Sequence, residues 1–291
     1  HEVGTEGAQC VSCHMPERTF MGVDPRRDHS FKVPRPDLSD TTGAPNACIG
    51  CHEEESNAWA AKEIAKRFPN GQWGQPHFSQ AFAGARAGDG RVIPALIEIA
   101  RDSNVAPIIR ASALDLLAQL DAPRAAVLAR PSLADASPLV RKAAILSQAA
   151  ASNADKATML EPLLGDPIRS VRLAAGRLLA GAPSMHLQAG SRERLRGVWK
   201  ALLDSYLATA DYPEGHMKMA GFGYAVNNVR GVEQAFKQAI AFDPKLGSAW
   251  MSLGRLYLLT GQPDRAIGIW MQGLETAGDD AGIYLQLARL R

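Results

Sequence analysis

The sequence predicts a mostly α-helical chain in which a loop-rich N-terminal segment is followed by an α-solenoid of paired helices. Two observations predict the solenoid. Apolar and small residues recur every 31 residues between 91 and 180, and every 34 residues after residue 210. A third observation sets the N-terminal segment apart, because residues 1–57 show little helical or strand periodicity. We therefore expect three regions, at 1–90, 91–190 and 191–291.

The N-terminal segment contains two copies of the motif Cys-x-x-Cys-His, and these motifs use all four cysteines of the chain. The motif is typical of haem c attachment, in which two thiols form thioethers and the adjacent histidine binds the iron. The sequence therefore predicts two covalently attached haem c groups. Their thioether residues are Cys10, Cys13, Cys48 and Cys51, and the proximal iron ligands are His14 and His52.

Zinc and disulfides are the alternative interpretations of the four cysteines. Paired Cys-x-x-Cys units also hold structural zinc, but a zinc site gives no reason for a histidine directly after both pairs. A disulfide framework is typical of short, cysteine-dense chains, and a chain of 291 residues with four cysteines is neither. Glycine and proline break residues 1–57 into turns, so we expect the bound haems to supply the core that this segment lacks.

Each haem iron needs a second axial ligand, and histidine in that position gives a low potential. The nearby candidates are His1, His29 and His77. Two further histidines, His186 and His216, lie in the helical region and are expected to be structural. The sequence thus predicts bis-histidine coordination.

A basic cluster lies between the two motifs and includes Arg26 and Arg27. Haem propionates are carboxylates, and arginine binds carboxylates through two parallel hydrogen bonds. These arginines are candidates for propionate partners. A solvated basic loop is the alternative, and the residues alone do not decide between the two.

The order of motifs in residues 1–57 resembles the last two haem sites of the pentahaem cytochrome c nitrite reductase superfamily, which includes cytochrome c554-like and hydroxylamine oxidoreductase-like proteins. The resemblance rests on Cys-Val-Ser-Cys-His-Met-Pro at 10–16, Asp-His at 28–29, and Cys-Ile-Gly-Cys-His at 48–52. More closely, the chain resembles bacterial multihaem cytochromes that continue into helical and tetratricopeptide (TPR) repeats.

This resemblance implies a scheme of distal ligands. His1 would serve the haem on Cys48 and Cys51, His29 would serve an earlier haem outside this chain, and His77 is the best downstream candidate for the first motif. The catalytic haem of the nitrite reductases uses Cys-x-x-Cys-Lys, which does not occur here. Reductase activity is therefore not carried over.

The region from 91 to 180 predicts stacked helical hairpins with a 31-residue period. Aligned positions hold Arg110, Arg141 and Arg172; Ala113, Ala144 and Ala175; and Ile109, Val140 and Val171. Val-Arg near the start of the second helix resembles HEAT repeats. We expect the recurrent arginines to bond the ends of neighbouring helices.

A helix near 192–210 is followed by a 34-residue period, in which His216, Trp250 and Tyr284 are equivalent. Large and small residues at this spacing, such as Trp250 and Gly254, resemble TPR repeats. Solenoids of both kinds expose concave surfaces that bind proteins. Protein binding is the first interpretation of this region, and a purely structural scaffold is the second.

Net charge is only +2, and its even distribution argues against a nucleic-acid partner. No apolar run reaches membrane-spanning length. We expect a segment of a longer exported bacterial protein, truncated at both ends and located in the periplasm or outside the cell.

Its predicted role is electron transfer to a redox partner or a further haem domain, with the repeats binding protein. The alternative is part of a nitrite reductase-like or hydroxylamine oxidoreductase-like enzyme whose catalytic haem lies upstream.

Overall fold

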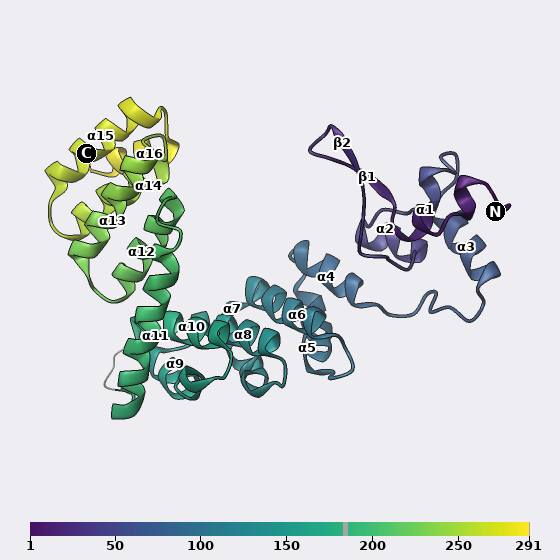
Figure 1. Ribbon diagram of the computed structural model, residues 1–291, viewed down its shortest axis with the longest axis horizontal. Helices are drawn as coiled ribbons and strands as arrows, with labels where there is room; N and C mark the ends of the chain where they lie inside the picture. The colour runs from purple at the N-terminus through teal and green to yellow at the C-terminus, as the bar shows by residue number, and fades with distance from the viewer. Residues whose placement is uncertain (183–185, 291) are drawn as a thin grey trace. The chain divides into compact units, whose positions relative to one another are not determined.

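The computed structural model describes residues 1–182 and 186–290, and the chain in these ranges is mostly helical (Figure 1). Contacts divide it into two compact units, His1–Ala125 and Ala126–Arg291. The strands in the described ranges are β1 (Glu17–Phe20) and β2 (Asp24–Arg27), which form one antiparallel pair. The predicted fold class, mostly α with helical repeats, is confirmed.

The first unit begins with short elements separated by turns. They are η1 (Glu6–Ala8), α1 (Cys10–His14), β1, β2, η2 (Pro36–Leu38), α2 (Ser39–Thr42), η3 (Cys48–Gly50) and α3 (Asn57–Arg67). The strands pair with Glu17 opposite Arg27 and Phe20 opposite Asp24. Met21, Gly22 and Val23 connect them; Met21 and Gly22 have positive φ angles of 51° and 79°, and the Val23 amide donates to the carbonyl of Phe20 at 3.2 Å. This hairpin is not predicted from the sequence, because its short strands lack the alternation of buried and exposed residues.

The rest of the first unit is a helical cluster. It contains α4 (Phe78–Arg86), η4 (Gly90–Val92), α5 (Ile93–Arg101), α6 (Pro107–Leu120) and the start of α7 (Ala122–Leu128). Helix α4 packs against α5 and α6 and also against α2. It therefore joins the loop-rich segment to the first helical hairpin, and the first compact unit ends at Ala125. The domain boundaries near residues 90 and 190 stay a prediction.

The 31-residue period of the sequence is visible in the starting points of the second helices. Helix α6 starts at Pro107, α8 (Pro138–Ser147) at Pro138, and α10 (Arg169–Leu178) at Arg169. Between them lie η5 (Arg130–Ala134), η6 (Gln148–Ala150), α9 (Asn153–Leu160) and η7 (Pro162–Gly165), and η8 (Leu179–Gly181) follows. Proline at the first helical position lacks the amide hydrogen that would have no partner there, which explains why two of these helices begin with it.

The recurrent arginines bond the ends of neighbouring elements, as predicted. Arg141 donates from Nη1 to the carbonyls of Asp135 and Ala136 at 2.8 and 3.0 Å. Arg172 donates from Nη1 to the carbonyls of Asp166 and Pro167 at 2.6 and 3.1 Å. In both repeats the guanidinium satisfies carbonyl groups in the turn that leads into its own helix.

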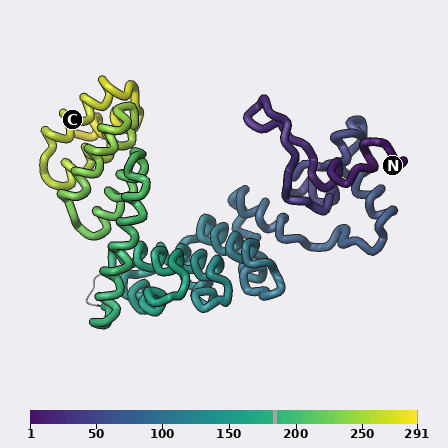
Figure 2. The backbone as a smooth tube through the Cα atoms, in the orientation of Figure 1, coloured from purple at the N-terminus to yellow at the C-terminus, as the bar shows by residue number. Residues whose placement is uncertain are grey.

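The 34-residue period is equally regular in the second unit. After α11 (Ala189–Leu207), the first helices of successive hairpins are α12 (Pro213–Ala225), α14 (Gly247–Leu259) and α16 (Ala281–Arg289), which start 34 residues apart. The second helices are α13 (Val229–Phe242) and α15 (Pro263–Ala277). Each helix packs on the next, and Figure 2 shows these hairpins side by side in green to yellow. No helix in the described ranges combines the length and apolar character that a membrane crossing requires.

Pairs of a tryptophan and a glycine lock two of these helices together. Trp270 of α15 lies against Gly254 of α14, so closely that a β-carbon at Gly254 would overlap the indole ring. The opposite pair places Trp250 against Gly273, where a β-carbon would lie 2.8 Å from the Trp250 Cβ. Trp270 is fully buried and donates from Nε1 to the carbonyl of Met251 at 3.1 Å. Small residues at these two positions therefore set how closely the helices approach.

A network of charged and polar side chains, centred on the half-buried Glu233, joins α13 to the next hairpin. The carboxylate of Glu233 accepts hydrogen bonds from Tyr257 and Arg265, each at 2.9 Å, and pairs with Lys237 at 2.9 Å. The hydrogen bond from Lys237, followed by that from Tyr257, lowers the pKa of Glu233 to about 2. The ionised carboxylate therefore stabilises the contact between successive hairpins.

We predict that Gly254→Val destabilises the chain by about 1–3 kcal/mol, because the added methyl groups meet a ring that cannot move in a packed core. Urea unfolding of both proteins measures this difference. Gly268→Ala is the matched control, since Gly268 lies on the exposed side of α15 with nothing within 4 Å of an added β-carbon. The control should raise stability by roughly 0.5–1 kcal/mol. Equal effects of the two changes would contradict the packing described here.

We predict that Glu233→Gln lowers the thermal unfolding temperature at neutral pH, and that the difference from the parent shrinks as the pH falls. The pKa of Glu233 is lowered from 4.5 in the absence of partners to about 2. Its stabilisation is therefore complete above pH 4.5 and is lost between 4.5 and about 2, as the carboxylate is protonated. Glu275→Gln, at an exposed position of α15, serves as the control. A difference that stays constant down to pH 3 would count against the network.

Candidate haem attachment sites

The first Cys-x-x-Cys-His motif forms the short helix α1. Cys10 and Cys13 stand three residues apart and Cys10 and His14 four apart, so all three lie on one side of the helix. Cys10 is exposed, and Cys13 and His14 are half-buried. Both cysteines are free thiols, as are those of the second motif. The helix thus presents two thiols and one imidazole in the same direction.

The imidazole of His14 is oriented by the backbone of residue 32. Its Nδ1 lies 2.7 Å from the carbonyl oxygen of Lys32, and the Lys32 amide donates to the carbonyl of His14 at 2.9 Å. A hydrogen bond from Nδ1 to a carbonyl selects the tautomer in which Nε2 carries a free lone pair. This is the arrangement that metal-binding histidines use, because the bond orients the ring and raises its basicity.

The loop that supplies this carbonyl is itself held in place. Asp28 accepts from the Ser30 amide and hydroxyl at 3.0 and 2.6 Å and pairs with Lys32 at 2.6 Å. These bonds, led by the one from Lys32, lower the pKa of Asp28 below its usual range. Phe31 has a positive φ of 44°, which is rare for an aromatic residue, and its ring stacks on His14 with centres 4.6 Å apart. The strain places an aromatic surface flat against the proximal histidine.

The second motif spans η3 and the residues after it. The Cys48 amide donates to Oδ1 of Asn46 at 2.9 Å, and the His52 amide donates to the carbonyl of Cys48 at 3.0 Å. Asn46 is buried and donates to Asn57, which in turn donates to Asp40 at 2.6 Å. Three side chains from different turns thus fix the start of this motif.

His52 lies between two aromatic rings. The Trp59 ring centre is 4.9 Å away, and the His1 ring centre is 5.7 Å away. Two metal–imidazole bonds of about 2 Å each place the centres of opposing rings roughly 6 Å apart. The observed separation of His1 and His52 is of this size. The structure therefore brings His1 and His52 close together, and their roles as iron ligands stay a prediction.

His77 is the N-cap residue of α4. Its Nδ1 lies 2.8 Å from the Ser79 hydroxyl and accepts from the Ser79 amide at 3.3 Å. Burial, followed by the charge of Arg35, lowers the pKa of His77. Because Nδ1 accepts the bond from the Ser79 amide, the neutral ring carries its proton on Nε2, and binding a metal through Nε2 would require His77 to give up the cap. The Gly74 amide bonds to Asp37 at 3.0 Å, so this stretch folds back onto the loop-rich segment.

The remaining candidates differ in their surroundings. His29 is an exposed residue of a turn. Arg26 pairs with Asp24 at 2.6 Å, and Arg27 donates to the carbonyl of Met15 at 3.4 Å, directly after the first motif. His186 is exposed, whereas His216 is buried in α12 and lies 2.9 Å from the carbonyl of Ala210. The contacts of His216 are those of a structural residue.

The loop-rich segment has almost no core of its own. In residues 1–59, all of which the structure describes, Leu38 is the only buried aliphatic or aromatic side chain apart from Pro36. Six of its large apolar side chains are instead exposed; they are Val3, Phe20, Met21, Val23, Phe31 and Val33. Soluble segments of this size normally bury such residues, so a large apolar group would complete the segment.

The donor set distinguishes haem from zinc. Structural zinc takes four ligands from the protein, whereas a porphyrin already supplies the equatorial ligands and leaves two axial positions. In residues 1–182 and 186–290, no three His, Cys, Asp or Glu side chains converge on one metal position. The pairing of His1 with His52 needs only two. A pair of histidines fits the two axial positions of a haem iron.

The two motifs lie within electrostatic reach of each other. Burial raises the pKa of the Cys48 thiol, and the negative charge of a Cys13 thiolate raises it further. Cys51 makes a smaller contribution. Cys13 thus acts on the ionisation of Cys48 although the two residues belong to different motifs.

Sequence reasoning identified the thiols and histidines but missed the groups that position them. Lys32 acts through its main-chain atoms, which no side-chain pattern reveals. Asn46 precedes Cys48 by two residues, a spacing typical of an Asx turn, and this is a signal that could have been found. The stacking of Phe31 depends on a backbone angle that the sequence does not encode locally.

Comparison with known families supports the repeat region. A family profile described as tetratricopeptide repeat matches residues 247–290, which form α14, α15 and α16. No curated protein gives a significant match to the chain. The C-terminal hairpins are thus similar to a module that binds proteins.

We predict that iodoacetamide modifies Cys51 roughly three to ten times faster than Cys48 in the folded, haem-free chain at about pH 8, because only the thiolate reacts. Cys51 is exposed, whereas Cys48 is half-buried and its pKa is raised. Mass spectrometry of the labelled peptides gives both rates. The two rates should become equal in urea. Equal rates in the folded chain would show that Cys48 is not shielded.

Proposed function

We propose that the chain is an exported c-type cytochrome that carries two haem c groups and exchanges single electrons with a protein bound by its helical repeats. The observation that carries the proposal is the pair of Cys-x-x-Cys-His motifs in a segment, residues 1–59, whose only buried apolar side chains are Leu38 and Pro36. The thioethers would form at Cys10 and Cys13 and at Cys48 and Cys51. When bound, haem c supplies a one-electron iron couple whose potential the protein sets.

At the first site the chain's own residues would hold and adjust the iron ligand. The Lys32 carbonyl orients the His14 ring through Nδ1 and leaves Nε2 as the nitrogen available to bind, and Phe31 restricts rotation of the ring by stacking against it. Both contacts favour a fixed imidazole plane. His77 is the candidate for the opposite axial position, which it would take through Nε2 after releasing its cap on the Ser79 amide.

At the second site His52 would bind from one side and His1 from the other. Their ring separation of 5.7 Å supports this pairing, and Trp59 restricts His52 from a third direction. Bis-histidine ligation gives a low potential and leaves no open position for a substrate. These features favour electron transfer over catalysis within this chain.

The neighbouring attachment positions support a relay. Cys13 lies near enough to influence the ionisation of Cys48, so the two cofactors would lie side by side. Arg27, beside the first motif, and Arg26 are candidates for pairing with propionates, which would raise the local positive charge. The TPR-like hairpins supply the protein-binding surface of the proposed carrier.

One observation favours a second function. His29 is exposed in a turn, and the resemblance assigns such a histidine to an earlier haem. A further haem domain upstream would use it, and that domain could contain the catalytic haem of a nitrite reductase-like or hydroxylamine oxidoreductase-like enzyme. In that case the chain would deliver electrons to, or remove them from, the upstream site.

We predict two haems per chain by pyridine haemochrome spectroscopy, and low-spin signals only by electron paramagnetic resonance, because histidine occupies both axial positions of each iron. His77→Ala should convert one of the two haems to a high-spin form, while the other keeps its spectrum.

His186→Ala is the control, since this exposed histidine lies outside the loop-rich segment, and it should leave both spectra unchanged. A low-spin spectrum of His77→Ala identical to that of the parent would remove His77 as a ligand. A colourless protein that contains zinc would contradict the proposed function as a whole.

A further inference from the structure

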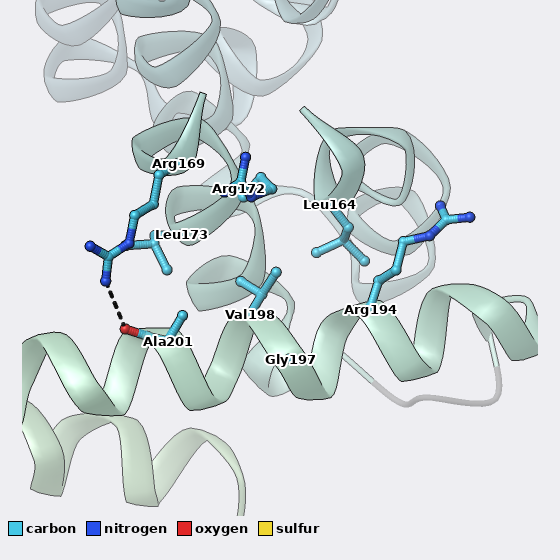
Figure 3. A pocket seen from close by; sticks show the side chains of 8 residues that line it. All are labelled: Leu164, Arg169, Arg172, Leu173, Arg194, Gly197, Val198 and Ala201. Carbon is cyan, nitrogen blue, oxygen red and sulfur yellow. Dashed lines mark hydrogen bonds between the residues drawn. The ribbon is translucent and has the colours of Figure 1, made fainter. Parts of the chain in front are cut away.

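A small pocket lies between α10 and α11, near the end of the 31-residue repeats (Figure 3). It has a volume of about 250 Å³. Leu173 and Val198 form apolar walls, and Arg169 and Arg194 lie on opposite sides of it. None of the eight residues that line it is acidic. Three arginines line it in all, the third being Arg172.

The preceding repeat shows how the arginine at this position is normally satisfied. Arg141 donates from Nε and Nη2 to the two carboxylate oxygens of Asp166, at 2.8 and 3.0 Å. Asp166 lies in the turn of the next repeat, so the pair joins two repeats. It is largely buried, with side-chain exposures of 12% and 5%. The bond from Arg141 lowers the pKa of Asp166.

Arg172 repeats half of this arrangement. Its Nη1 bonds the carbonyls of Asp166 and Pro167, just as Nη1 of Arg141 bonds those of Asp135 and Ala136. The opposite edge of the guanidinium, formed by Nε and Nη2, has no hydrogen-bond partner among residues 1–182 and 186–290. This is the edge that binds the carboxylate in the preceding repeat.

The carboxylate is missing because the repeat ends here. Asp166 follows Arg141 by 25 residues, and the residue 25 positions after Arg172 is Gly197. Gly197 lines the pocket from α11, a single helix of 19 residues that replaces the next hairpin. A β-carbon added at Gly197 would have nothing within 4 Å. The space for an acidic side chain is therefore open.

We propose that this pocket binds the carboxylate of an aspartate or glutamate side chain on a partner polypeptide, with an adjacent apolar residue against Leu173 and Val198. Bidentate pairing with a carboxylate is the preferred interaction of a guanidinium. Arg169 and Arg194 add positive charge, although Arg169 also donates to the carbonyl of Ala201 at 3.4 Å. The inference deepens the interaction role proposed for the repeats and is independent of the haem assignment.

The size of the pocket and the chain's own Asp166 specify the occupant. A volume of about 250 Å³ is below that of most small-molecule sites and suits one or two side chains. The segment 162–168, Pro-Leu-Leu-Gly-Asp-Pro-Ile, provides such a carboxylate to Arg141 within this protein. We therefore expect a partner segment in which an acidic residue is followed or preceded by an apolar one.

The test uses the full chain and a synthetic peptide of residues 162–168 with both ends blocked. The peptide should bind in calorimetric titration at up to about 5 mM, and replacing its aspartate by asparagine should weaken binding by about tenfold or more. Arg194→Gln, at an exposed position, should weaken binding several-fold without unfolding the chain. Arg172→Gln is unsuitable alone, because Arg172 also bonds two backbone carbonyls.

Two variants at Gly197 provide the matched comparison. G197D places a carboxylate in the pocket, so it should weaken peptide binding by about tenfold and raise the unfolding temperature by about 2–4 °C above that of G197N. G197N has the same size and similar helix propensity without the charge, and it should still bind the peptide.

Equal binding of the aspartate and asparagine peptides, or equal binding by G197D and G197N, would overturn the proposal. Displacement of the peptide by inorganic phosphate at the same concentration would also overturn it, since that result describes a general anion site. Tighter binding of a peptide whose only carboxylate is its C-terminus would do the same. The haem spectrum of each variant is recorded in parallel, so failure of the pocket and failure of the haem assignment are distinguished.

Discussion

The helical region depends on one constraint: a single hairpin cannot bury its own apolar face, and the next hairpin must cover it. Trp270 illustrates the constraint, because it is fully buried only where Gly254 of the neighbouring helix leaves room for it. The ion pair between Arg141 and Asp166 obeys the same constraint, because its two side chains come from successive repeats and each is shielded from solvent only when both repeats are present. At the end of a stack, the last repeat therefore presents a side chain whose partner in the next repeat is missing. The pocket beside Arg172 is the place where this happens between the two kinds of repeat.

The N-terminal segment meets the same need for burial in a different way. Its turns are defined by hydrogen bonds from short side chains, such as those of Asp28 and Asn46, and not by packed apolar residues. Such bonds determine local geometry well but contribute little net free energy each. Such a segment is suited to enclosing a rigid aromatic group. The loops would fix the orientation of the side chains that hold the group, and the group would supply the buried apolar surface. The proposed cofactor would thus be part of the fold as well as of the chemistry.

Much of the helical architecture follows from periodicity. The helices beginning at Pro107, Pro138 and Arg169 are spaced as the aligned residues of the sequence require, because a repeated pattern reports a repeated packing surface. The attachment motifs are equally direct, since their chemistry needs particular side chains at fixed spacing. The Lys32 carbonyl and the left-handed backbone of Phe31 could not be predicted, because both arise where separate loops meet. The unpaired edge of the Arg172 guanidinium could not be predicted either, because Arg141 and Arg172 align in sequence and differ only in their hydrogen-bond partners.

The way in which Lys32 supports His14 has a consequence for sequence variation. Two hydrogen bonds join residue 32 to His14. One uses the main-chain carbonyl of residue 32 and the other uses its amide, so neither depends on the side chain at that position. Relatives that replace this lysine would lose its ion pair with Asp28 but would keep both main-chain bonds to His14. Proline alone is excluded, since it has no amide hydrogen to donate to the His14 carbonyl. Among relatives, the role of position 32 in orienting the proposed metal ligand would then show as a lack of proline there, and not as a shared residue.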